Sequence, residues 1–413
     1  MADGYLIAGF VLAFAMAFAV GSNDAANSLA TSYGSNALKK PILISIGACF
    51  EFIGAYWCSG HVAAKLVDDV IEDRTDLNNE EDEQIMIAVG MASFIFVIAS
   101  SVFGMPVSGT HAVVGALVGA GLASVGADDV NWEKLGIICA SWVVAPVCAI
   151  ILSSIFFISV CKTTQSPDKW QFAARLLWMC LFIAVAFALI TYMIIALVKD
   201  KGEKMNTWEL SLLCASPVIG VLIVRIALIF CVRPKNLGCC KAFCAVMKLW
   251  SCEDYVTFHK ERILEEDDEQ LETANKTPEN EVEKEQNVIM QVYRVCMLSA
   301  EFLVALGHGA NDVANCICPL LIILEIHDKE IKWAYLTGGL GIAVGMLMLG
   351  WRTMETVGKK IIKLDYVKGF TAQFSTALTV NFGTVIGMPL STTHCICGSI
   401  FGLVVSNKLS KTA

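Results

Sequence analysis

The sequence has few charged residues for its length. Lysine, arginine, aspartate and glutamate make up only 17% of its 413 residues, whereas about 25% is usual in soluble proteins. Hydrophobic residues make up 56%, and the mean hydropathy is +0.63. This balance argues against a soluble globule, a disordered chain and a secreted disulfide scaffold, and it predicts a polytopic membrane protein with apolar runs of about 20 residues.

Basic residues are absent from four long stretches, 1–38, 84–133, 295–328 and 369–407. Most of the apolar sequence lies in or near these stretches, and eleven apolar segments can be recognised. Their lengths predict an all-α polytopic fold, and their Gly and Pro residues predict interrupted helices and hairpins. The predicted segments are 5–33, 42–59, 84–103, 111–125, 135–160, 176–198, 208–232, 289–324, 333–351, 369–386 and 394–406.

Two sequence motifs occur twice. GSNDAAN at 21–27 returns as GANDVAN at 309–315, and GMPVSGTH at 104–111 returns as GMPLSTTH at 387–394. Because their order and spacing are both kept, we infer an internal duplication. The predicted organisation is a first repeat (1–160), additional membrane spans (161–232), a linker (233–288) and a second repeat (289–413).

Corresponding loops of the two repeats carry opposite charge. Residues 60–83 hold nine acids and two bases, whereas residues 352–368 hold five bases and two acids. Cytoplasmic loops collect Lys and Arg, which predicts that 352–368 lies inside and that 60–83 and the N-terminus lie outside. The repeats are therefore expected to be inverted in the membrane, with the acidic linker in the cytoplasm. Secondary transporters built in this way bind substrate near the bilayer midplane.

The first motif pair predicts cation binding. Asp24 and Asp312 lie in apolar surroundings, where a carboxylate is costly without a partner. Small and amide-bearing neighbours, among them Asn27 and Asn315, allow irregular backbone and supply oxygen ligands. Carboxylate and amide oxygens suit a hard cation such as sodium. The alternative is structural, with Asx residues that cap a break in each helix.

The second motif pair predicts anion binding. In each copy a Pro and a Ser or Thr precede an apolar helix, so two helix N-termini are expected within the bilayer. Free backbone amides, the positive end of the helix dipole and hydroxyl groups favour an anion there, unless these residues only cap their helices. The hydroxyl-bearing residues are Ser108, Thr110, Ser391, Thr392 and Thr393.

No Lys or Arg accompanies these motifs, and the two aspartates would repel an anion. Bound sodium ions or protons would remove that repulsion, so anion binding should require the cation. A tetrahedral oxyanion suits several hydroxyl and amide donors. Phosphate keeps a proton near neutral pH and can donate to a carboxylate, whereas sulfate cannot. The residues thus favour phosphate and leave sulfate and proton coupling open.

The chain resembles the inorganic phosphate transporter (PiT) family of cation-coupled phosphate symporters. The resemblance rests on both motif pairs and on GWRTMETVGKK at 350–360, and it covers 1–160 and 289–407. It implies alternating access, a homodimer in the plasma membrane, both termini outside, and sodium coupling if the source is an animal. It implicates Asn23, Asp24, Asn311 and Asp312 with the Ser and Thr residues in binding phosphate and sodium, and it gives Glu51 and His308 a supporting place. His111 and His394 follow the Thr donors and either support the site by tuning its pH response or only pack between helices.

Two features depart from the family pattern. Cys316 and Cys318 stand where small residues are usual, and the second repeat has no counterpart of the span at 135–160, so the last of twelve spans is expected to be missing. A non-transporting phosphate sensor therefore stays open. An enzyme is not expected, because no nucleophile–base set or His-rich metal site appears. The expected partners are phosphate, sodium or protons and the lipid bilayer, with no nucleic acid and no resident cofactor.

Overall fold

The computed structural model describes residues 2–59, 78–164, 278–361, 364–385 and 387–412, with a few isolated residues between these ranges. The predicted spans 176–198 and 208–232 and the linker up to residue 277 lie almost entirely outside the described residues. The predicted division of the chain at 160, 232 and 288 therefore stays a prediction. Helix α11 already includes residue 278, within the predicted linker 233–288.

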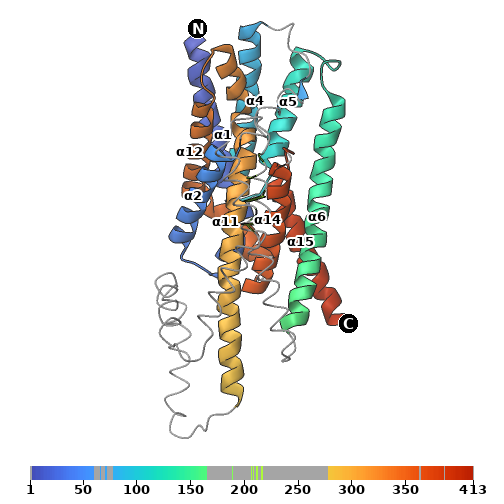
Figure 1. Cartoon of the computed structure of the whole chain (residues 1–413). Coiled ribbons are helices and arrows are strands. Elements are labelled where there is room, and N and C mark those ends of the chain that lie inside the picture. The colour runs from blue at the N-terminus through green and yellow to red at the C-terminus, as the bar shows by residue number, and fades with distance from the viewer. Residues whose placement is uncertain are drawn as a thin grey trace.

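Long helices make up the described chain (Figure 1). Nine of the eleven predicted apolar segments lie in helices, and five helices are long and apolar enough to cross a membrane. The helices are α1 (Ala2–Ser35), α2 (Lys40–Trp57), α4 (Asn79–Val102), α5 (Gly109–Ser124), α6 (Trp132–Thr164), α11 (Pro278–Ile326), α12 (Lys332–Leu349), α13 (Trp351–Glu355), the π-helix η1 (Thr356–Ile361), α14 (Tyr366–Val385) and α15 (Thr392–Thr412).

Helices α1 and α11 run without interruption through the motifs at 21–27 and 309–315. The expectation of irregular backbone there is wrong. The glycines of these motifs serve close helix packing instead. A Cβ on Gly21 would collide with the carbonyl oxygen of Ile342 in α12, and one on Gly309 would collide with the carbonyl oxygen of Glu51 in α2.

The predicted interruptions lie at the second motif pair. Helix α4 ends at Val102 and α5 begins at Gly109, whereas α14 ends at Val385 and α15 begins at Thr392. Gly104 and Gly387 have φ values of +66° and +72°, a left-handed conformation that only glycine adopts readily. Helices α5 and α15 start near the middle of the bundle and run towards opposite ends (Figure 1).

Side-chain contacts show which segments share an end of the bundle. Tyr5 near the start of α1 donates to Glu80 Oε1 over 3.3 Å, and His327 just after α11 lies 2.6 Å from Glu83 Oε1. At the other end of α1, Lys359 Nζ lies 5.0 Å from the centroid of the Tyr33 ring. Helices α1 and α11 are therefore antiparallel, and residues 78–83 and η1 lie at opposite ends, as their opposite charge predicts.

The two described ends of the chain lie at opposite ends of the bundle (Figure 1). The start of α1 is at one end, and α15 runs from the middle towards the other. The side of the membrane that each end faces stays a prediction.

Candidate functional site

The four motifs meet in the middle of the bundle. Asn27 Nδ2 on α1 donates to Thr393 Oγ1 over 2.9 Å. In the corresponding contact of the second repeat, Asn315 Nδ2 on α11 donates to Thr110 Oγ1 on α5 over 3.0 Å. Each asparagine of one repeat thus bonds to a threonine at the helix start of the other repeat. The predicted cation and anion residues form one site.

The aspartates of the two motifs are bonded in the same way. Asn27 donates to Asp24 Oδ1 over 2.9 Å, and Asn315 donates to Asp312 Oδ1 over 3.1 Å. Thr393 donates to Asp24 Oδ1 over 3.2 Å. Thr392 on the same helix donates to Asp312 Oδ2 over 3.0 Å. These residues are buried, and the hydroxyls of α15 bond to the carboxylates of both motifs.

His308 lies at the centre of the acidic groups. Its Nδ1 lies 2.6 Å from Glu51 Oε2, and its Nε2 lies 2.7 Å from Asp312 Oδ2 and 3.6 Å from Asp24 Oδ2. All four side chains are buried. His308 and Asp312 are four residues apart and so share a face of α11, which the sequence could have indicated. The approach of Glu51 and Asp24 comes from tertiary packing.

Several buried amide oxygens of the site have no hydrogen-bond partner. They are the Oδ1 atoms of Asn27, Asn311 and Asn315. A buried acceptor without a donor is unfavourable, and a cation would supply the missing interaction. Asp24, His308 and Asp312 each offer one ligand atom, and these three atoms lie within 4.8 Å of one another. Carboxylate and amide oxygens of this kind suit a hard cation such as sodium. The assignment of Asp24, Asn27, Asp312 and Asn315 as cation ligands stays a prediction.

Asn23 and Asn311 hold the loops that precede α5 and α15. Asn23 Nδ2 donates to the carbonyl oxygen of Met105 over 2.9 Å, and its Oδ1 accepts from the Val107 N–H over 2.8 Å. Asn311 Nδ2 donates to the carbonyl oxygen of Met388 over 3.3 Å. The asparagines thus tie each helix motif to the loop of its own repeat. Their role as phosphate ligands stays a prediction.

Helices α5 and α15 are capped by the predicted serines. Ser108 Oγ accepts from the His111 N–H and Ser391 Oγ accepts from the His394 N–H, both over 3.3 Å. Helix capping, the structural alternative to anion binding for this motif pair, is therefore present. Thr110 Oγ1 donates to the carbonyl oxygen of Leu390 over 3.1 Å. The two helix starts are in direct contact, with hydroxyl groups and positive dipole ends gathered in one place.

The two motif histidines meet beside the site. The ring centroids of His111 and His394 are 4.7 Å apart, and His111 stacks on Trp142 of α6 at 3.7 Å. His111 Nδ1 lies 2.7 Å from Ser108 Oγ. The structure therefore gives both histidines a packing role between the repeats. The position of Trp142 has no signal in the sequence, because its helix carries neither motif.

Two buried glutamates, Glu51 on α2 and Glu301 on α11, form hydrogen bonds with α1. Glu51 Oε1 accepts from Ser28 over 2.8 Å, and this bond joins α2 to the site. The supporting role of Glu51 stays a prediction. Glu301, to which the sequence assigned no role, is also buried. Its Oε1 accepts from the Ser32 N–H over 2.7 Å and from the Thr31 hydroxyl. No counterpart or motif in the sequence pointed to this second acid.

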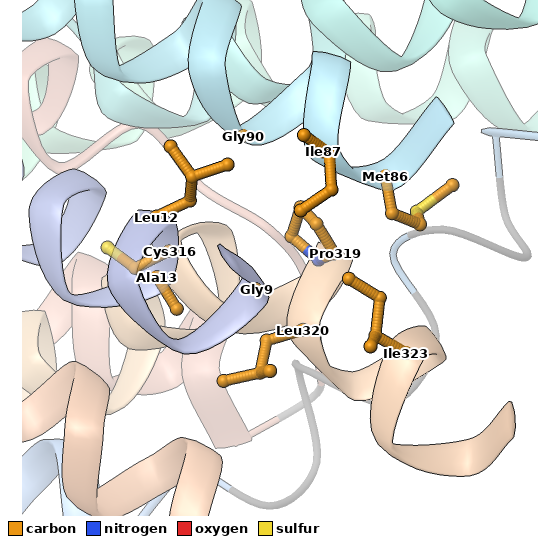
Figure 2. A pocket seen from close by; sticks show the side chains of 10 residues that line it. All are labelled: Gly9, Leu12, Ala13, Met86, Ile87, Gly90, Cys316, Pro319, Leu320 and Ile323. Atoms are coloured by element: carbon orange, nitrogen blue, oxygen red, sulfur yellow. The ribbon is translucent and has the colours of Figure 1, made fainter. Parts of the chain in front are cut away.

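A crevice elsewhere in the bundle is apolar. Figure 2 shows it between α1, α4 and α11, with side chains that include Leu12, Met86 and Leu320. No charged side chain lines it. It therefore does not compete with the motif cluster as a site for an ion.

Apolar helices of membrane-spanning length, with ionisable groups buried at their centre, define a polytopic membrane protein of the transporter class. The chain belongs to the phosphate transporter family, whose sequence profile matches residues 20–412. The family resemblance expected from the motifs is thereby confirmed, and both family and fold are those of a transporter.

Individual relatives cover nearly the whole chain. A protein of Pyrococcus abyssi named "Putative phosphate permease" is 30% identical over 97% of this chain and 89% of its own length. A Haemophilus influenzae protein with the same description is 31% identical over 95% and 86%. The Arabidopsis thaliana protein "Inorganic phosphate transporter 2-1, chloroplastic" is 28% identical over 96% and 65%.

A solved structure shares the fold. It is titled "The sodium-dependent phosphate transporter", and it superposes with a TM-score of 0.77 at 28% identity. The match covers 98% of this chain and 90% of the other. The arrangement of helices described above is therefore that of a known phosphate transporter.

Proposed function

We propose that this chain is a symporter that imports inorganic phosphate together with sodium. The observation that carries the proposal is the joining of both aspartates to the hydroxyl-bearing helix starts through Asn27, Thr392 and Thr393. Cation ligands and anion donors are thus bonded to each other in one buried site. The names of the similar permeases and of the sodium-dependent structure support the choice of phosphate and sodium.

Coupling follows from the charges of the site. Asp24, Asp312 and Glu51 are buried acids, and the motif-bearing stretches hold no Lys or Arg. His308 alone brings a group that can carry positive charge among them. A phosphate anion entering beside these carboxylates would be repelled strongly in a medium of low dielectric. Sodium bound to the carboxylates and the unpartnered amide oxygens would offset that repulsion, so phosphate should bind only together with sodium.

The substrate ligands would come from the two helix starts. Ser108, Thr110, Ser391, Thr392 and Thr393 lie where the N-termini of α5 and α15 meet, and free backbone amides and hydroxyls of this kind bind tetrahedral oxyanions. In the structure the threonine hydroxyls donate to protein oxygens. Phosphate would therefore replace these internal acceptors when it binds.

The reciprocal contacts support inverted repeats and alternating access. Helices α1 and α11 are antiparallel, α5 and α15 run towards opposite ends, and each repeat's asparagine bonds to the other repeat's threonine. A site made equally by two inverted halves can face either side when one half rocks against the other. We include in the proposal an outside N-terminus, a cytoplasmic linker and a homodimer in the plasma membrane. Epitope accessibility in intact cells tests the sidedness, and cross-linking tests the dimer.

Uptake of labelled phosphate into proteoliposomes tests the function. An inward sodium gradient should drive accumulation, and a proton gradient of equal size should not. Unlabelled phosphate should compete in excess, and sulfate should not. Phosphate binding without flux would instead identify a sensor, and equal competition by sulfate would remove the choice of phosphate.

A further inference from the structure

Glu301 is a buried acid that the proposed transport cycle does not use. It lies on α11, away from the aspartate cluster, and its side chain is 0% exposed. Its Oε1 accepts from the Ser32 N–H over 2.7 Å and from the Thr31 hydroxyl. Its Oε2 is buried without a hydrogen-bond partner, as is the Oγ of Ser32. One half of the carboxyl group is therefore satisfied and the other half is bare.

No positive charge in the described part of the chain pairs with this group. Glu301 forms no ion pair with any residue that the structure describes, and only Thr31 and Ser32 hydrogen-bond to it. Titratable groups on the helices packed against α11 include Asp24 and Tyr33 on α1, Lys40 and Glu51 on α2, and Tyr366 and Lys368 on α14. Lys40 lies over the ring of Tyr33. On α11 itself Arg294 and His308 are each two turns away, and they contact Ala37 and Glu51 respectively.

An ionised carboxylate in this position would be costly. Its net charge would lie inside a helix bundle with no cation paired to it. A proton on Oε2 removes the charge and turns Oε2 into a donor, while Oε1 remains the acceptor of its two hydrogen bonds. The unpartnered Ser32 hydroxyl is a suitable neighbour for such a donor. The neutral acid therefore suits the observed surroundings, whereas the ionised form leaves them unbalanced.

We propose that Glu301 is a proton-binding site, separate from the sodium and phosphate site, which holds a proton while α1 and α11 are packed together. The hydroxyl-bearing face of α1 connects the two sites, since Ser28 bonds to Glu51 and Thr31 bonds to Glu301 one turn further on. When movement of the repeats lets water reach Thr31 and Ser32, the acid can release its proton. The proposal does not depend on which anion the chain carries.

Infrared spectroscopy of the purified full chain in lipid nanodiscs tests the proposal without any transport. Protonated carboxyl groups absorb apart from carboxylates, so their band can be compared between variants. Glu301→Gln, which mimics the neutral acid in shape, should remove one component of this band at neutral pH. Glu355→Gln is the matched control, because Glu355 is a 42% exposed acid near Lys359, and it should leave the band unchanged.

Two results would overturn the proposal. The first is an identical band in the wild-type chain and Glu301→Gln, which would mean that Glu301 is ionised. The second is a Glu301 component that disappears when sodium replaces choline at constant pH, which would assign the bare oxygen to sodium. Loss of phosphate uptake in all proteins, with the Glu301 component intact, would contradict the proposed transport and leave the proton site standing.

The pH dependence of uptake gives a second readout. The uptake rate of the wild-type chain should vary with pH at saturating sodium, and Glu301→Gln should flatten that dependence while it still transports. Thr31→Val removes one donor to Oε1 and keeps the carboxyl group, so it should shift the pH profile rather than flatten it. An unchanged pH profile in both variants would count against the proton site.

Discussion

The side-chain amide of Asn27 donates to the hydroxyl of Thr393 over 2.9 Å, although the two residues are 366 positions apart. Thr393 in turn donates to Asp24 Oδ1. A residue at the start of α15 thus holds the acid that lies one turn before Asn27 on α1. This bond joins the two halves of the chain at the place where cation and anion are expected to meet, and it makes their coupling testable residue by residue.

Loss of either aspartate charge should abolish coupled uptake. Asp24→Asn and Asp312→Asn keep the size of the side chains but remove the charge that would attract sodium. We expect sodium-driven phosphate uptake to fall to background in both. Asp365→Asn is the matched control, because Asp365 pairs with Lys368 at the surface and is 42% exposed. Undiminished uptake in both aspartate variants would refute the cation role of these residues.

Sodium-coupled uptake should depend on the hydroxyl of Thr393 and not on its methyl group. Thr393→Val removes a group that accepts from Asn27 and donates to Asp24, which leaves buried polar atoms without partners. Such losses cost about 1–3 kcal/mol, so the apparent sodium affinity should weaken by about tenfold, since about 1.4 kcal/mol is a factor of ten. Thr393→Ser should behave like the wild-type chain. Equal sodium dependence of uptake in Val and Ser variants would show that the hydroxyl is not used.

Close packing at Gly21 should be essential for stability. A Cβ there would collide with the backbone of Ile342, so Gly21→Ala must push α1 and α12 apart. Overpacking of this kind costs about 1–3 kcal/mol and should lower the unfolding temperature of the purified protein by several degrees. Gly115→Ala is the control, because nothing lies within 4 Å of its Cβ position. Equal unfolding temperatures for the two variants would contradict the described packing.

His308 should compete with sodium for the carboxylates. Its ring nitrogens lie 2.6 Å from Glu51 and 2.7 Å from Asp312, so a protonated ring takes the place of a bound cation. His308→Gln removes that positive charge, and added sodium should then raise the unfolding temperature more than it does in the wild-type chain. His327→Gln alters a histidine that pairs with Glu83 near the end of the bundle and should not change this response. A smaller sodium effect in His308→Gln than in the wild-type chain would contradict the competition.

The sequence allowed much of the fold to be predicted. Apolar length alone located nine described helices, and the glycine and proline residues at 104–108 and 387–391 located the breaks before α5 and α15. The duplicated motifs predicted which residues would gather, since repeats of one sequence form similar contacts. Gly21 led to a wrong prediction of irregular backbone at 21–27, because glycine both breaks a helix and lets two helices approach closely. Only the packing of α12 against α1 decides between these two uses.

The centre of the site could be predicted only in part. Asp24 and Asp312 were identified through their motifs, but the position of His308 between them and Glu51 depends on how α2 packs against α11. Trp142 and Glu301 belong to no motif, and their contacts with His111 and Ser32 arise from tertiary packing. Local sequence patterns carry no information about such contacts. Charge signs did predict that 78–83 and η1 lie at opposite ends of α1.

The central claim is that the anion cannot bind beside the buried carboxylates unless sodium binds with it. Binding of labelled phosphate to the purified chain, measured at equilibrium in sodium and then in choline at the same ionic strength and pH, tests it most directly. We predict saturable binding in sodium and none in choline, with sodium dependence lost in Asp24→Asn. Equal phosphate affinity in sodium and choline would contradict the account.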